Sequence, residues 1–71
     1  MWDAKLAEAI AECIKRVADM RSDSDVMLEE NPGVYVTVRN CDEPEYEYRI
    51  DVDTKEVKFR VDSSDWKRIE L

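Results

Sequence analysis

Histidine is absent from the 71-residue chain, so no arrangement that pairs a nucleophile with histidine can operate in it. General acid–base catalysis would therefore depend on Asp, Glu, Lys, Tyr or Cys side chains. Carboxylates are abundant, but none lies at a position that the hydrophobic pattern predicts to be buried, where desolvation raises the pKa of an acid. The sequence predicts no catalytic residue and no enzymatic activity.

Two acidic segments, Asp23–Asp25 and Asp51–Asp53, match the first two ligand positions of a calcium-binding EF-hand loop. Both lack an oxygen ligand at position five, where Met27 and Lys55 stand, and both lack the glycine at position six. The single glycine, Gly33, also excludes a glycine-rich phosphate-binding loop. We therefore expect no metal ion and no cofactor.

The two cysteines, Cys13 and Cys41, are too far apart for a CxxC redox pair or a metal site. Cys13 lies in an apolar stripe, where a thiol behaves as a small hydrophobic group, so we expect it to be buried and unreactive. Cys41 stands beside Asp42 and Glu43, acids that disfavour the thiolate. We expect both thiols to be reduced, and the alternative of a bridge between them stays open.

The charge balance excludes several classes of partner. Eleven basic residues against 18 acidic ones give a net charge of −7, which argues against binding to nucleic acid and to anionic membrane surfaces. No stretch approaches the ~20 apolar residues of a membrane span, and Asp3, Lys5 and Glu8 interrupt the region where a signal peptide would be apolar. We expect a soluble, cytoplasmic protein without a signal peptide.

A helix from Asp3 to Met20 is predicted by apolar residues spaced three and four apart, with Asp3 as the N-cap. After Ser24 the apolar period changes to two, which predicts four strands, each with one apolar face. The expected fold is therefore α+β: one domain over residues 1–71, with an amphipathic helix packed on a four-stranded antiparallel meander in the order α-β-β-β-β. The expected core is Leu6, Ile10, Cys13, Ile14, Val17, Val26, Leu28, Val34, Val36, Val38, Tyr46, Tyr48, Ile50, Val52, Val57, Phe59 and Val61.

The connections are short. Asn31-Pro32-Gly33 suits a type II turn. A two-residue loop at Thr54-Lys55 would set Val52 opposite Val57, Ile50 opposite Phe59 and Arg49 opposite Arg60. The tail 63–71 opens with capping residues and has Trp66 and Ile69 three apart, which favours a short C-terminal helix.

Two aromatic features stand outside the expected core. Tyr35 points outward near Arg49 in the simplest register, which favours a cation–π pair. Trp2 and Trp66 either cap the rim of the core or anchor a partner protein, since Trp is enriched at binding hot spots.

Acidic residues are expected to gather at one end of the sheet. Residues 1–22 are neutral, so the rest of the chain carries the whole net charge. In a meander, the start of the first strand, the loop between strands two and three, and the end of strand four share one end. This end either provides solubility or docks on a basic protein surface. Its residues, here called the acidic end, are Asp23, Asp25, Asp42, Glu43, Glu45, Asp62 and Asp65.

The segment 46–57, YEYRIDVDTKEV, resembles the closing hairpin of PepSY-type domains. These are small helix-plus-antiparallel-sheet modules associated with peptidase inhibition and secretion. The resemblance implies the same fold, although Lys55 stands where the family's turn usually has glycine.

The chain also resembles computationally designed mini-proteins, because it has one amphipathic helix, strictly alternating strands, no histidine and charges on nearly every outward position. Three methionines and two cysteines depart from that pattern. The sequence thus favours a designed, stable, non-enzymatic fold that requires no partner. The alternative is a small acidic interaction or inhibitor domain, either PepSY-like or a viral protein that docks on a basic partner.

Overall fold

The computed structural model describes residues 2–22 and 25–71, and its single long helix, α1, spans Ala4–Met20. The predicted N-cap is confirmed, because Asp3 Oδ1 accepts a hydrogen bond from the Leu6 amide at 2.8 Å. The helix ends where the Arg21 amide donates to the Val17 carbonyl at 2.9 Å. Across the described residues, no helix is long and apolar enough to cross a membrane.

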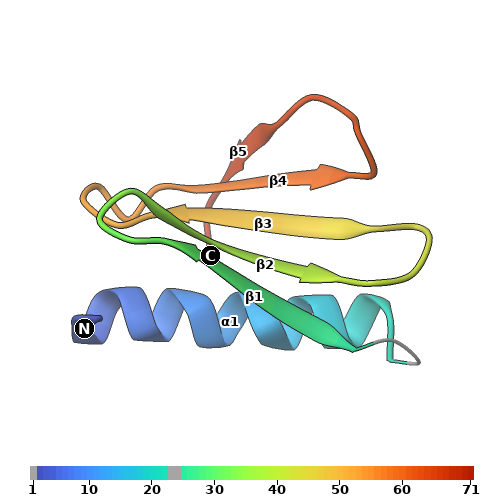
Figure 1. Ribbon diagram of the computed structural model, residues 1–71, viewed down its shortest axis with the longest axis horizontal. Coiled ribbons are helices and arrows are strands. Elements are labelled where there is room, and N and C mark those ends of the chain that lie inside the picture. Colours follow the sequence, from blue (N-terminus) through green and yellow to red (C-terminus); the bar gives the residue numbers. More distant parts are fainter. Residues whose placement is uncertain (1, 23–24) are drawn as a thin grey trace.

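The described residues form five strands in one antiparallel sheet: β1 (Val26–Asn31), β2 (Tyr35–Asn40), β3 (Tyr46–Asp51), β4 (Val57–Val61) and β5 (Lys67–Ile69). Neighbours in the sheet are neighbours in the chain, so the sheet is a meander. Helix α1 lies along one face and contacts β1, β2 and β3 (Figure 1). The predicted α+β class, with one helix on an antiparallel meander, is confirmed.

The tail differs from the expectation, because β5 is a strand and not a short helix. Lys67 pairs with Phe59 and Ile69 pairs with Val57, at the edge of β4. This pairing lets Ile69 pack against the core. A helix of two turns would be marginal in isolation, so the hydrogen bonds that β4 offers decide the conformation.

The turns account for the register of the sheet. The predicted type II turn is present, since the Val34 amide donates to the Asn31 carbonyl at 3.0 Å and Gly33 has a φ of 77°. The predicted loop between β3 and β4 was wrong. The Asp51 amide donates to the Glu56 carbonyl at 2.9 Å, so four residues, 52–55, form the connection.

This longer loop shifts the β3–β4 pairing by two residues. Ile50 lies opposite Val57 and Arg49 opposite Lys58, where Phe59 and Arg60 were expected. An even shift keeps every side chain on its predicted face, so the apolar face survives the error. Within the loop, Lys55 has a φ of 64°, and its Nζ lies 3.1 Å from Asp3 Oδ2 at the start of α1.

The core lies between α1 and the central strands. Two predicted core residues are exposed: Leu28 at 45% and Val34 at 50%. β1 is an edge strand that α1 covers less than β2 and β3, and Val34 follows a turn. Ile14, Val26, Val52 and Phe59 are half-buried against the core, and Tyr46 and Val61 are also half-buried. The fully packed set is Leu6, Ile10, Cys13, Val17, Val36, Val38, Tyr48, Ile50 and Val57.

Candidate functional site

Three segments lie at one end of the sheet: the start of β1, the β2–β3 loop (residues 41–45) and the β4–β5 loop (residues 62–66) (Figure 1). Up-and-down strand order requires this arrangement, because each of these segments lies at the same end of its strand. The acidic end is therefore built from loops, and its shape depends on what holds each loop.

Asn40 holds the β2–β3 loop. Its side chain is fully buried at the end of β2. Its Nδ2 donates to the carbonyl oxygens of Asp42 at 2.7 Å and Pro44 at 3.0 Å, and its Oδ1 accepts from the Tyr46 amide at 2.6 Å. One amide side chain thus satisfies three main-chain groups, which fixes the path of the loop. The sequence analysis did not single out Asn40, although Asn directly before a loop is a turn signal.

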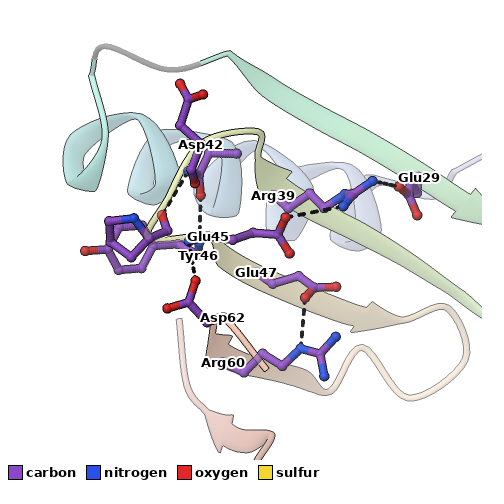
Figure 2. A network of polar contacts seen from close by, with 10 residues as sticks. Glu29, Arg39, Asp42, Glu45, Tyr46, Glu47, Arg60 and Asp62 are labelled. Carbon is purple, nitrogen blue, oxygen red and sulfur yellow. Dashed lines mark hydrogen bonds and ion pairs between the residues drawn. The ribbon is translucent and has the colours of Figure 1, made fainter. Parts of the chain in front are cut away.

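Asp62 ties the β4–β5 loop to the start of β3. Its Oδ1 accepts from the Glu45 amide at 2.9 Å, and its own amide donates to the Glu45 carbonyl at 2.7 Å (Figure 2). Asp62 has a φ of 53°, a left-handed conformation that Asp tolerates better than most residues. The two loops therefore form one connected surface.

A shallow hollow lies between these loops, and carboxylates line it. Of the seven acids predicted to converge, the structure brings four together here. No lysine or arginine lines the hollow in the described part of the chain, so its electrostatic potential is negative. The lining residues are Cys41, Asp42, Glu43, Glu45, Asp62 and Ser63.

The other three predicted acids lie outside this hollow. Asp25 is exposed directly before β1, and Asp65 is exposed in the β4–β5 loop. Both are at the same end of the sheet, but neither lines the hollow. Asp23 lies outside the described residues.

Arg39 offsets part of the negative charge beside the hollow. Its Nη1 lies 3.4 Å from Glu45 Oε2, and its Nη2 binds the Glu29 carboxylate (Figure 2). Arg39 therefore neutralises part of the charge of Glu45. Asp42, Glu43 and Asp62 contribute the other carboxylates of the hollow.

Glu47 corrects the expectation that every carboxylate lies on a solvated face. It is only 7% exposed on the outer face of the sheet, and its Oε1 accepts from Arg60 Nε at 2.8 Å (Figure 2). The shift in register places Arg60 directly opposite Glu47. The buried acid is thus half of an ion pair, which explains why it can be buried at all.

A stack of arginines and aromatic rings crosses the outer face. The predicted Tyr35–Arg49 pair is confirmed, with the guanidinium carbon 4.2 Å from the ring centroid. Trp66 folds over the same face, with its ring 4.6 Å from Arg49 and 4.4 Å from Arg60. Trp66 is half-buried, so it packs on the sheet, whereas Trp2 is exposed.

The two cysteines lie in different environments. Both thiols are free, with Cys13 buried under α1 and Cys41 exposed. Burial raises the pKa of Cys13 to about 12, so its thiol stays protonated at neutral pH. Burial likewise raises the pKa of Tyr48.

Among residues 2–22 and 25–71, no group of three or more His, Cys, Asp or Glu side chains is placed to hold a metal ion. Comparisons with protein-family models, curated proteins and solved structures find no match to the chain. Inference about function therefore depends on the geometry of the surface.

Proposed function

We propose that the chain is a non-enzymatic domain that docks its acidic end on a basic surface of another protein. One observation carries this proposal: the residues that line a single hollow include Asp42, Glu43, Glu45 and Asp62 and, within the described surface, no lysine or arginine. The hydrogen bonds of Asn40 and Asp62 hold the backbone of the loops that carry these acids. A preorganised surface loses little conformational entropy when it binds.

Electrostatics gives this arrangement a physical role. Carboxylates that lie within about one Debye length, ~8 Å at physiological salt, add their fields in the surrounding solution. Such a field speeds the encounter with a basic surface by about tenfold or more. Solubility alone would be served equally well by acids scattered over the surface.

The chemistry of the buried groups supports a non-enzymatic role. The one nearly buried carboxylate, Glu47, is neutralised by Arg60, and the buried thiol of Cys13 is protonated. Neither Cys13 nor Tyr48 lines the hollow between the two loops. Two free thiols fit a reducing compartment such as the cytoplasm.

A designed scaffold without a cognate partner is the second proposal. It is supported by the strict alternation of the central strands, the Asp3 N-cap and the short loops. In that case the acidic end contributes only solubility and protection of sheet edges. Lys55, which stands where the turn of PepSY-type domains usually has glycine, has a φ of 64°, a conformation that glycine adopts more readily.

A titration with a lysine-rich peptide, followed by the amide chemical shifts of the protein, tests the docking proposal. We expect shifts centred on the β2–β3 and β4–β5 loops, and binding weakened about fivefold or more in the variant D42N/E43Q/D62N. Asn at position 62 keeps an oxygen acceptor for the Glu45 amide, so the loops stay connected.

The matched control is E8Q/D19N/D53N, which removes the same charge from exposed sites elsewhere. Each variant carries −4 in place of −7, so a difference between them reports location and not net charge. Equal weakening in both variants, or shifts spread evenly over α1 and the loops, would overturn the proposal.

A further inference from the structure

A row of positive charge crosses the outer face of the sheet, although the protein is acidic. Arg49 lies directly opposite Lys58, and Lys58 lies directly opposite Arg68. Like charges directly opposite on neighbouring strands are destabilising. The chain has 18 acids that could have separated these bases, so stability does not explain the row.

Only one member of the row has an acidic partner in the described structure. Arg68 Nε lies 3.5 Å from Glu56 Oε1. Arg49 and Lys58 make no ion pair with any described residue. The nearby Asp51 carboxylate is engaged in its own turn, where it accepts from the amides of Asp53 and Thr54.

Arg49 is held in place but incompletely bonded. The rings of Tyr35 and Trp66 lie 4.2 Å and 4.6 Å from its guanidinium carbon, and they fix the position of the group. Its Nε is buried and has no hydrogen-bond partner within the described chain. A guanidinium stacked in this way directs its remaining N–H donors along its own plane, where a planar oxyanion binds in a bidentate manner.

A hollow on the described surface lies at this position. It has a volume of about 100 Å³ and is lined by Tyr35, Arg49, Asp51, Glu56 and Lys58. The hollow is open to solvent and has room for a carboxylate or phosphate group. Two cations without an ion-pair partner among the described residues and an aromatic wall favour an oxyanion. The two acids of the lining are engaged elsewhere, Asp51 with its own turn and Glu56 with Arg68.

We propose that this hollow is a binding site for a small oxyanion, a carboxylate or phosphate group held between Arg49 and Lys58. The anion accepts hydrogen bonds in the plane of the Arg49 guanidinium and forms an ion pair with the Lys58 ammonium. A bound anion reduces the electrostatic repulsion between Arg49 and Lys58, so it stabilises the row of bases. The site is separate from the acidic end and takes a ligand of the opposite charge.

The test is a titration with acetate, inorganic phosphate and glycine at fixed ionic strength, with sodium chloride as the reference. The readouts are the side-chain Nε–H signal of Arg49 and the indole N–H signal of Trp66. We expect saturable shifts with a dissociation constant of about 1 mM for at least one oxyanion. The ranking of acetate, phosphate and glycine identifies whether a carboxylate, a phosphate or a zwitterion is preferred.

The variant K58Q, which changes an exposed side chain, should weaken binding about tenfold, and K15Q on α1 should leave it unchanged. R49K keeps the charge but loses the planar donors, and it should also weaken binding. Shifts that rise linearly with all salts, or that are equal in K58Q and K15Q, would overturn the proposal.

Discussion

Asp62 and Glu45 are joined twice: the Asp62 carboxylate accepts from the Glu45 amide at 2.9 Å, and the Asp62 amide donates to the Glu45 carbonyl at 2.7 Å. These residues belong to different loops and are 17 positions apart in the chain. Because both are acids, the contact brings their charges together while main-chain groups hold them. The backbone that carries Glu45 and Asp62 is therefore fixed at this end of the sheet.

Asn40 should be among the residues on which stability depends most. We expect Asn40→Ala to lower the free energy of unfolding by about 2–3 kcal/mol, because three main-chain groups lose their partner. Urea denaturation measures this change. Asn31→Ala, at an exposed strand end, is the control and should cost less than ~1 kcal/mol. Equal losses in the two variants would show that Asn40 does not organise the loop.

Trp66 should hold β5 on the sheet. Replacing Trp66 with Ala removes two cation–π contacts and should cost about 1–2 kcal/mol. The amides of Lys67–Ile69 should then exchange with solvent faster, while those of β2 and β3 keep their protection. Trp2→Ala, at an exposed site, should leave this pattern unchanged. Undiminished protection of β5 in the Trp66 variant would contradict the account.

Asp51 should make the protein sensitive to acid. Hydrogen bonds from the amides of Thr54 and Asp53 lower the pKa of Asp51 below its ordinary value of 3.8. A carboxyl group whose pKa is lower in the folded state stabilises that state above the unfolded pKa, and this contribution is lost as the pH falls through the folded pKa. The stability advantage of the wild type over Asp51→Asn should therefore shrink below about pH 4.

Urea titrations from about pH 7 to about pH 2.5 measure this effect. Asp53→Asn, a neighbouring acid whose side chain makes no hydrogen bond in the described structure, is the control. If the difference in unfolding free energy between wild type and Asp51→Asn stays constant over the whole pH range, the charge of Asp51 does not stabilise this turn.

The two cysteines should differ in reactivity. A thiol-reactive chromophore should modify Cys41 in the native protein and reach Cys13 only on unfolding. Because burial raises the pKa of Cys13 from 9.0 to about 12, its stabilising contribution is complete below pH 9.0 and is lost as the pH rises toward 12. Cys41→Ser should abolish the native reaction. The prediction would be contradicted if the two thiols reacted at the same rate, or if adding a reductant lowered the melting temperature.

The fold could be predicted because it depends on periodicity. The change from a period near 3.6 to a period of two fixed the helix, the antiparallel strands and the buried face. The β3–β4 register could not be predicted, because it depends on one left-handed residue, Lys55, that is not glycine. β5 was missed for a related reason, since three residues carry too little pattern to outweigh a capping signal.

Part of the acidic end followed from topology alone, because a meander places alternate loops together. The sequence did not indicate which acids would share a hollow, since that depends on Asn40 and Asp62 bonding to the main chain. Likewise, Glu47 became buried only through its pairing with Arg60, which followed from the shifted register. Long-range contacts of single side chains are the information that periodicity lacks.

The central claim is that the acidic end is a docking surface. The most direct test is the rate at which the protein associates with a basic partner that has been purified by its binding to the wild-type protein. We expect D42N/E43Q/D62N to associate about tenfold more slowly at low salt, with a weaker dependence on ionic strength, while E8Q/D19N/D53N stays near the wild-type rate. Unfolding free energies equal to or slightly above wild type in both variants would show that the fold is intact. Association rates that are the same for the two variants at every salt concentration would contradict the account.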